Sequence, residues 1–394
     1  MGITGSRVAV IGGSIAGCAA AIALTRAGCD VTVFERTRGD LRERGFGIGM
    51  SVSILETLIA GGYVSPDLAV VPGQERLFVV RDGEAREGRV LWRQPLPVRL
   101  TNWSMLWRSL RERVADPAYL DGTTATIEDA DETGATISSG PSTGRFDLVI
   151  GADGYASRVR QRVTPESAPY FPGYALWRGT YPEDLLPDGA VTALKPGTLM
   201  VCFPGGHAMI YLIPDHVRTG LLIHWGVYIG PPRPMTHPAL IPPGQVPPDL
   251  MTVLYDVLTE SFPPLWADVI ARTPAERISV QPIFDVTAPR YVAGRLVLAG
   301  DAGATARPHT GSGAVKALED ALALEAGCRG ATQWAPVLAG YDGERTAAGN
   351  ALTALGRSLG RGLVESTPDW SAMSQADVTA WWRAAASGRT SLYE

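Results

Sequence analysis

Short apolar runs recur along the chain, and three of them end at glycine-rich turns. The runs Arg7–Ile11, Leu148–Ile150 and Leu296–Leu298 are almost entirely aliphatic, which is typical of buried strands. The first run is followed by a helix-like stretch over residues 15–27 and by a second strand, "DVTVF". The third precedes "AVKALEDALALE", a stretch of good helix formers. This order of strand, turn and helix predicts an open α/β sheet.

The middle of the chain has a different pattern. Residues 166–285 contain the strand-like runs "TLMVCFP", "HAMIYLIP" and "GLLIHWGVY", together with proline-rich stretches such as "GPPRPMTHPALIPPGQVPP". Residues 123–150 alternate like a hairpin ("TTATIEDADETGATIS") before the strand of the DG motif. After Gly313 the sequence is alanine-rich and predicts mainly helices. The pattern therefore indicates a mixed sheet that interrupts the α/β segments.

Composition narrows the class of protein. The chain has 394 residues, 45% of them hydrophobic, which is enough for two domains. A net charge of -5 gives no reason to expect nucleic acid or an anionic membrane as a partner. The four cysteines form no CxxC pair and no metal-ligand spacing with histidine, so we expect no metal, no disulfide and a cytoplasmic location. Arg7 and the apolar run after it resemble a signal peptide, but glycines interrupt that run and a second strand follows it.

The turn after the first strand has the features of a dinucleotide site. In "GGSIAG", Gly12 permits a sharp turn, Gly17 allows helix and strand to approach closely, and Ser14 replaces the glycine that faces the pyrophosphate. The helix start supplies free N–H groups for phosphates. Glu35 ends the second strand near the spacing at which an acid binds a ribose hydroxyl. Because a carboxylate repels a 2′-phosphate, the sequence predicts FAD or NAD here rather than NADP.

Two later segments also place polar residues after buried strands. In "GADGYASRVR" (151–160), the pair Asp153-Gly154 is by itself compatible with an ordinary turn. In "AGDAGATARPHTGSG" (299–313), Asp301 lies at the carboxyl end of a strand, where ligands of open α/β sheets bind. Gly311 and Gly313 then free the backbone before a helix begins.

Together the three segments resemble the class A flavoprotein aromatic hydroxylases, which carry a GxGxxG, a DG and a GD motif in this order. "TNWSMLWRSLR", "GYALWRGT" and "ARPHTG" add a similarity to the 2,6-dihydroxypyridine 3-hydroxylase-like branch. The resemblance implies an α/β fold with a Rossmann-like FAD-binding domain of the glutathione-reductase type, a smaller α+β substrate domain with a mixed sheet, and C-terminal helices. The corresponding ranges are 1–72, 99–165 and 286–345 for the FAD-binding domain, 73–98 and 166–285 for the substrate domain, and 346–394 for the helical segment.

The resemblance also implies that one FAD molecule spans both glycine-rich sites. The first holds the adenosine and pyrophosphate, Asp301 takes a ribityl hydroxyl, and the backbone around Gly311 and Gly313 lies under the flavin ring. NADPH or NADH binds transiently, since the chain has no second βαβ unit, and O₂ is the co-substrate. Surface ion pairs remain the alternative for the arginines and for Asp153. The implied cofactor-binding residues are Gly12, Ser14, Gly17, Glu35, Arg36, Arg44, Arg108, Asp153, Arg160, Gly300, Asp301, Pro308, Gly311 and Gly313.

Candidate substrate-binding residues come from the strands of the middle region. In "LLIHWGVY", alternation puts His224 on one face and Trp225 on the other, and one of these faces should line the pocket. Tyr211 in the neighbouring strand and Trp177 in "YALWRG" are further candidates. We expect His207, His216 and His237 to lie in loops without a role.

His309 is the leading catalytic candidate, with His224 and Tyr211 behind it. It takes the place of the second proline in the Pro-Pro pair that many of these hydroxylases have at the flavin loop. A base there would make a ring hydroxyl more nucleophilic, although a histidine hydrogen-bonded only within the loop is the alternative.

The sequence hypothesis is therefore an FAD-dependent, NAD(P)H-consuming monooxygenase. It would hydroxylate an electron-rich aromatic or heteroaromatic ring through a C4a-hydroperoxyflavin, as a monomer or homodimer. The alternatives are an oxidase or another flavin-dependent tailoring enzyme, or a flavin-binding protein without turnover.

Overall fold

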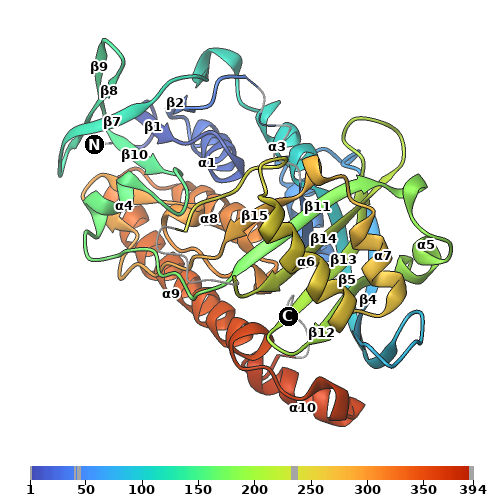
Figure 1. Cartoon of the computed structure of the whole chain (residues 1–394). Coiled ribbons are helices and arrows are strands. Elements are labelled where there is room, and N and C mark those ends of the chain that lie inside the picture. Colours follow the sequence, from blue (N-terminus) through green and yellow to red (C-terminus); the bar gives the residue numbers. More distant parts are fainter. Residues whose placement is uncertain (1, 40, 42–45, 232–237, 390–394) are drawn as a thin grey trace.

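The computed structural model describes residues 2–39, 41, 46–231 and 238–389. Two large sheets organise this part of the chain, one of six strands and one of eight, with a small three-stranded sheet beside the first (Figure 1). The α/β fold with a second mixed sheet, expected from the sequence, is confirmed.

The six-stranded sheet contains the predicted buried strands. Its order is β16-β17-β10-β1-β2-β6, and every neighbouring pair is parallel except β16 with β17. Helices α1 and α8 pack against each other, and α3 packs against α1. The elements are β1 (Arg7–Ile11), α1 (Ile15–Arg26), β2 (Asp30–Phe34), α3 (Trp103–Arg111), β6 (Tyr119–Leu120), β10 (Leu148–Gly151), β16 (Val292–Ala293), β17 (Leu296–Leu298) and α8 (Gly313–Cys328).

Strand order explains why three distant motifs belong together. Strands β17, β10 and β1 are adjacent and parallel, so their carboxyl ends lie at one edge of the sheet. The turns that follow them carry Asp301, Asp153 and Gly12, respectively. Because β2 and β10 flank β1 on opposite sides, the chain reverses its direction of winding there, which is where open α/β sheets bind ligands.

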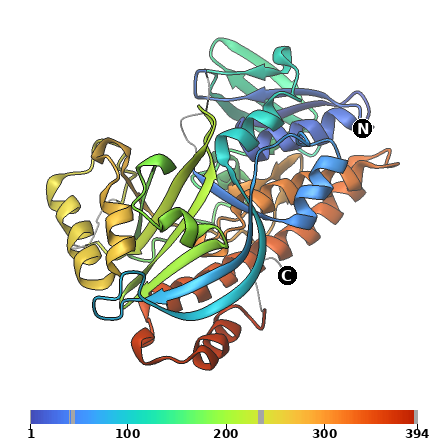
Figure 2. The ribbon, with the colours of Figure 1, turned by 90° about the vertical axis from the view of Figure 1, so that its right-hand side faces the viewer.

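The eight-stranded sheet has the order β15-β11-β14-β13-β12-β4-β5-β3, with only β12 and β4 parallel among its described pairs. Helices α6 (Pro248–Ser261) and α7 (Pro264–Ala271) cover the sheet face that lies away from the six-stranded sheet (Figure 2). The strands are β3 (Gly47–Ser51), β4 (Val71–Val80), β5 (Arg89–Asn102), β11 (Ala175–Pro182), β12 (Gly197–Phe203), β13 (Gly206–Pro214), β14 (Leu221–Ile229) and β15 (Ser279–Pro282).

In the described chain, the remaining strands and α-helices before the C-terminal part make up a small sheet and three short helices. Strands β7 (Ala125–Asp131) and β8 (Gly134–Ser139) form the expected hairpin, extended by β9 (Ser142–Phe146). The shorter helices are α2 (Val52–Ala60), α4 (Arg158–Val163) and α5 (Ala190–Leu194).

The C-terminal part is helical. Helix α9 (Trp334–Gly360) continues into a π-helical turn (Arg361–Glu365) and is followed by α10 (Gln375–Ala385), which packs on β5 (Figure 1). Helix α9 runs unbroken across residue 346, and the division of the chain into domains stays a prediction. None of the described helices is both long and apolar enough to span a membrane.

Candidate active site

A cavity of about 1380 Å³ is lined by residues of both large sheets. Glu35 and Asp301, expected at opposite ends of one dinucleotide, both line it. Its volume exceeds the roughly 300–1,000 Å³ of ordinary ligand pockets, so it has room for more than one small molecule. The predicted residues that line it are Gly12, Ser14, Glu35, Arg36, Asp153, Tyr211, His224, Asp301, Pro308, His309, Gly311 and Gly313.

The turn between β1 and α1 is built around its glycines. Gly12 has a φ of +107°, and a Cβ there would lie 2.3 Å from the carbonyl oxygen of Ala152. A Cβ on Gly17 would lie 1.8 Å from the carbonyl oxygen of Gly12, so helix and strand touch there. Ser14 is the N-cap of α1, but its side chain makes no capping hydrogen bond. The first N–H groups of the helix are therefore left for a ligand.

Glu35 is held rigidly at the end of β2. Its Oε2 accepts a hydrogen bond from the Gly13 N–H at 2.8 Å, and its Oε1 accepts one from the Thr37 N–H at 2.8 Å. The carboxylate is buried but borders the cavity. Since each carboxylate oxygen has a second acceptor site, this group can still bind a ribose hydroxyl.

The DG motif supports the neighbouring GD loop. Asp153 accepts hydrogen bonds from the Ser157 hydroxyl and from the Arg158 N–H (2.7 Å), which caps α4. Arg160 is buried and donates to the carbonyl oxygens of Ala302 (3.0 Å) and Tyr155. Arg160 does not border the cavity, so its contacts give it a role in holding the loop.

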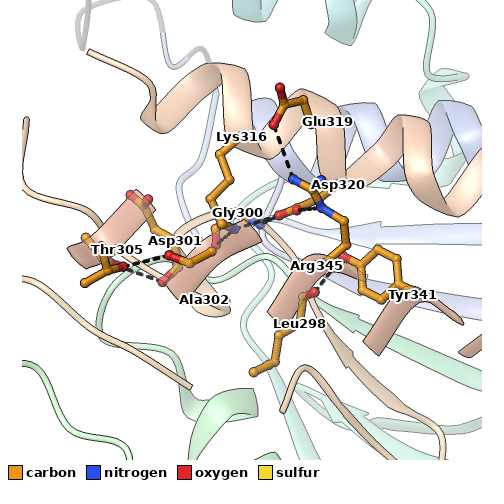
Figure 3. A network of polar contacts seen from close by, with 12 residues as sticks. Leu298, Gly300, Asp301, Ala302, Thr305, Lys316, Glu319, Asp320, Tyr341 and Arg345 are labelled. Carbon is orange, nitrogen blue, oxygen red and sulfur yellow. Dashed lines mark hydrogen bonds and ion pairs between the residues drawn. The ribbon is translucent and has the colours of Figure 1, made fainter. Parts of the chain in front are cut away.

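Two side chains of α8, Lys316 and Asp320, hold the backbone of Gly300 as a clamp (Figure 3). The Gly300 N–H donates to Asp320 Oδ2 at 2.8 Å, and its carbonyl oxygen accepts from Lys316 Nζ at 2.9 Å. Gly300 has a φ of +58°, and a Cβ there would lie 2.6 Å from the Cβ of Ala16. This position therefore requires glycine, and Gly300 itself lies behind the cavity wall.

Arg345 of α9 completes this buried network. Its Nε donates to Asp320 Oδ1 at 2.7 Å, while the hydroxyl of Tyr341 donates to the carbonyl oxygen of Leu298 at 2.8 Å. Two helices thus fix the strand end on either side of Gly300 (Figure 3).

Asp301 points away from the clamp, toward the cavity (Figure 3). Its carboxylate makes no hydrogen bond within the described chain, although its backbone carbonyl accepts from Thr305 Oγ1 at 2.9 Å. Enclosure by protein raises the pKa of Asp301, and Lys316 partly opposes this rise. A free carboxylate at this place is suited to accept a hydrogen bond from a ligand hydroxyl.

The start of α8 closes the same end of the cavity. Gly311 has a φ of +63°, and a Cβ on Gly313 would meet nothing within 4 Å. Ser312 is the N-cap of α8 and makes no side-chain capping hydrogen bond. The exposed N–H groups favour a polar or negatively charged edge of a bound molecule.

His309 is buried beside this helix start. Its Nε2 lies 2.6 Å from the Tyr174 hydroxyl, and Arg307 Nη1 lies 3.5 Å from that hydroxyl. The other ring nitrogen, Nδ1, has no described partner. Burial, with His207 and Arg307 nearby, lowers the pKa of His309 well below 6.5. The ring is therefore neutral, the form that can accept a proton, although its lowered pKa makes it a weak base. The catalytic role of His309 stays a prediction.

The eight-stranded sheet presents an aromatic face to the cavity. The rings of Tyr211 and His224 lie 4.9 Å apart, and that of Phe46 lies 5.8 Å from His224. Arg178 lies over Phe46, with its guanidinium carbon 3.4 Å from the ring centroid. Burial, reinforced by Arg178, lowers the pKa of His224 to about 3, so this ring is also neutral.

The chain is similar to known flavoproteins over most of its length. Residues 7–60 match the family described as pyridine nucleotide-disulphide oxidoreductase. It is 29% identical to the 2,6-dihydroxypyridine 3-monooxygenase of Paenarthrobacter nicotinovorans over 339 residues, 82% of this chain and 83% of that protein. It is 28% identical to the kynurenine 3-monooxygenase of Salinispora arenicola over 372 residues, 86% of this chain and 76% of that protein.

A solved structure gives the same result. The 2,6-dihydroxypyridine-3-hydroxylase from Arthrobacter nicotinovorans superposes with a TM-score of 0.82 at 25% identity, covering 94% of this chain and 96% of that chain. The protein is a flavoprotein monooxygenase. The expected resemblance to FAD-dependent aromatic hydroxylases is thereby confirmed.

The cavity of the monooxygenase fits FAD, its cofactor, by its own geometry. The uncapped starts of α1 and α8 border the cavity together with Glu35, and a free Asp301 carboxylate lies between α1 and α8 along its wall. The start of α1 would hold the pyrophosphate, and the start of α8 the flavin edge. Glu35 would hold the adenosine ribose, and Asp301 the ribityl chain. The glycines required at positions 12 and 300 keep the two carboxylates in place.

Two tryptophans predicted to bind the substrate lie elsewhere. Trp177 and Trp225 are fully buried in the core between the monooxygenase's eight-stranded sheet and α6 and α7, and neither lines the cavity. Trp225 Nε1 donates to Thr273 Oγ1 at 2.8 Å. The alternation was correct, but the helices cover the Trp225 face, so His224 and Arg178 border the cavity instead.

The histidines that were given no role have different outcomes. His207 lies in β13, not in a loop, and its ring stacks on Tyr228 with centroids 4.5 Å apart. It lines the cavity, so that expectation was wrong. His216 follows β13 outside regular structure and lies 3.2 Å from Asn102, while His237 lies outside the described residues.

Arg108 and Arg44 were both predicted to contact the cofactor. Arg108 belongs to α3 and does not line the cavity, although its neighbour Trp107 donates from Nε1 to the carbonyl oxygen of Gly13 at 2.9 Å. Arg44 lies outside the described residues. The segment "TNWSMLWRSLR" therefore steadies the first glycine turn through Trp107.

Proposed function

We propose that this monooxygenase uses FAD and NADH or NADPH to hydroxylate an electron-rich aromatic or heteroaromatic ring. The single observation that carries the proposal is the continuous cavity. It joins Glu35 and Asp301, at the expected ends of FAD, to the aromatic face that carries Tyr211 and His224. Bound FAD, reduced by NAD(P)H, supplies the activation of O₂ and the transfer of one oxygen atom.

The residues of the chain bind and orient the reactants. Glu35 and the start of α1 would hold the adenosine and pyrophosphate, and Asp301 the ribityl chain. The positive end of α8 stabilises negative charge on the flavin edge. The rings on the sheet face would pack against an aromatic ring and exclude water, which limits loss of reducing power as peroxide.

Neutral histidines fit this chemistry. His309 would donate a hydrogen bond from Nδ1 to an acceptor on the substrate or cofactor, because Tyr174 engages its other nitrogen. His224 would contact the ring from the sheet face, where Tyr211 packs beside it. Such contacts help to hold a ring hydroxyl in the state that reacts.

A direct assay tests the proposal. The purified protein is expected to be yellow, and its oxidation of NADH or NADPH should accelerate when a suitable hydroxylated pyridine, phenol or indole is added. Mass spectrometry of the product should show one added oxygen, derived from O₂. Oxygen consumption independent of NAD(P)H, with stoichiometric peroxide, would instead indicate an oxidase. A colourless protein that ignores added FAD would refute the proposal.

A further inference from the structure

Arg178 is a cation without a counter-ion in the cavity wall. Across the ranges that the structure describes, its guanidinium makes no hydrogen bond and no ion pair, and its Nε is buried without a partner. Other buried arginines have polar partners: Arg307 pairs with Asp285 at 2.8 Å, Arg345 pairs with Asp320 at 2.7 Å, and Arg160 donates to two backbone carbonyl oxygens. An uncompensated buried charge is costly, so its retention beside a ligand cavity indicates a ligand that compensates it.

Within the part of the chain that the structure describes, no carboxylate is found among the ionisable groups that face Arg178. The ionisable groups that face it are Tyr211, Tyr228 and His224. Burial raises the pKa of Tyr228 and lowers that of His224 to about 3, so both are neutral near pH 7. Burial also lowers the pKa of Arg178 to about 10, which leaves the guanidinium charged under the same conditions.

The position of Arg178 places it at the substrate end of the cavity. In the sheet it lies opposite Gly226, which also borders the cavity. Two residues along β14, the Tyr228 ring lies 4.7 Å from the ring of His309, which borders the flavin loop. Phe46 stacks on the guanidinium and fixes its plane.

We propose that Arg178 docks an anionic oxygen of the aromatic substrate, either a ring carboxylate or an ionised ring hydroxyl. The inference rests on the proposed function and names the class of ring that the enzyme selects. A guanidinium offers two parallel N–H donors to such a group, and the neighbouring aromatic rings suit a flat ring rather than a sugar phosphate. The phosphates of FAD are expected at the start of α1, between the groups bound by Asp301 and by Glu35, and not at Arg178.

Matched pairs of probes test this inference in the FAD-loaded enzyme without turnover. Benzoate and benzamide, 3-hydroxybenzoate and 3-hydroxybenzamide, and nicotinate and nicotinamide differ in charge but little in shape. Titrations followed by the flavin absorbance and by calorimetry should show, for at least one pair, an anion bound at least tenfold more tightly than its amide. The variant Arg178→Met should remove that preference by weakening only the anion.

Two further variants separate docking from folding. Arg178→Lys keeps the charge without the planar fork, so it should retain a reduced preference for the anion. Arg272→Met removes an exposed guanidinium that pairs only with Asp268 on α7, and it should bind every probe as the wild type does. A uniform loss of affinity for anion and amide in Arg178→Met, or a loss of FAD affinity with the preference intact, would overturn the inference.

The two proposals fail separately. If the wild-type holoenzyme shows no preference for the anion in any pair, Arg178 is not a docking group, even where ring compounds stimulate NAD(P)H oxidation. If no flavin binds, the proposed function fails first.

Discussion

Lys316 and Asp320, one turn apart on α8, hold the two polar ends of Gly300. Lys316 Nζ lies 2.9 Å from the Gly300 carbonyl oxygen, Asp320 Oδ2 lies 2.8 Å from its nitrogen, and the two side chains are 2.7 Å apart. The helix whose first turn faces the flavin end of the cavity therefore also sets the direction of Asp301. One rigid element positions both groups.

Removing the acid from this clamp should weaken both the fold and FAD binding. In Asp320→Asn, Lys316 and Arg345 lose a buried counter-charge, and breaking such a pair costs about 3–5 kcal/mol. We expect the free energy of unfolding to fall by about 3 kcal/mol and the dissociation constant of FAD to rise by about tenfold, because Asp301 loses its fixed direction. Urea denaturation and fluorescence titration with FAD measure these two effects.

Glu319→Gln is the matched control for this change. Glu319 contacts the same Arg345 at 3.3 Å, but its side chain is 45% exposed, and exposed ion pairs contribute about 0–1 kcal/mol. The control should behave nearly as the wild type. Equal losses in the two variants would contradict the clamp.

Glu35→Gln should weaken FAD binding without unfolding the protein. The amide has one acceptor oxygen in place of two, so it cannot satisfy both the Gly13 and the Thr37 N–H and also accept from a ribose hydroxyl. We expect the FAD dissociation constant to rise by about 10–100-fold, equivalent to about 1.4–2.8 kcal/mol. Asp30→Asn, at the start of the same strand, should leave the FAD dissociation constant unchanged. A similar rise in this variant would contradict the assignment of Glu35 to the ribose.

The sequence predicted the cofactor half of the site better than the substrate half. Gly12, Gly300 and the acids Glu35 and Asp301 follow from local rules about turns and strand ends, and all except Gly300 border the cavity directly. The shared edge of the sheet comes from the strand order, in which β17, β10 and β1 are adjacent and parallel.

The substrate face depended on packing that no local pattern encodes. Alternation separated His224 from Trp225 correctly, but α6 and α7 decide which face is covered. The same rule in β11 buries Trp177 and turns Arg178 to the cavity, so the arginine was the better candidate. His207 was missed because its strand begins at a glycine turn, Gly205-Gly206, that resembles a loop in the sequence.

Adjacent residues in β14 should respond oppositely to substitution. Trp225→Phe removes the hydrogen bond to Thr273 and part of a core ring, so we expect a loss of about 1–3 kcal/mol of stability with normal activity in the folded fraction. His224→Asn, on the cavity face, should change the melting temperature little and lower ring-stimulated NAD(P)H oxidation by about tenfold. Thermal melts measure the stability of both variants, and steady-state assays measure their activity. If Trp225→Phe lost activity and His224→Asn lost stability instead, the assignment of His224 to the cavity face would be wrong.

His309→Ala should uncouple NAD(P)H oxidation from hydroxylation while FAD stays bound. The variant loses the proposed Nδ1 donor and opens space for water beside the flavin loop. We expect the peroxide released per NAD(P)H to rise and the product to fall by about tenfold. Tyr174→Phe frees Nε2, so it should show a weaker form of the same defect. Unchanged coupling in His309→Ala would end its candidacy.

Acid should destabilise the protein through its buried histidines. Burial lowers the pKa of His207 and His224 to about 3 and that of His309 well below 6.5. The unfolded chain then binds more protons than the native one below about pH 6.5, so stability is complete above that pH and falls as the pH drops toward 3.

The size of this acid effect can be isolated with one substitution. At pH 5 each of these histidines should cost on the order of 1–2 kcal/mol, while the raised pKa of Asp301 acts in the opposite sense. His207→Phe keeps a ring against Tyr228 but cannot titrate, so denaturation at pH 7.5, 6.5 and 5.5 should show a shallower loss than in the wild type. An identical slope in both proteins would mean that His207 binds protons equally in the native and unfolded states, and the argument from burial would then fail for this residue.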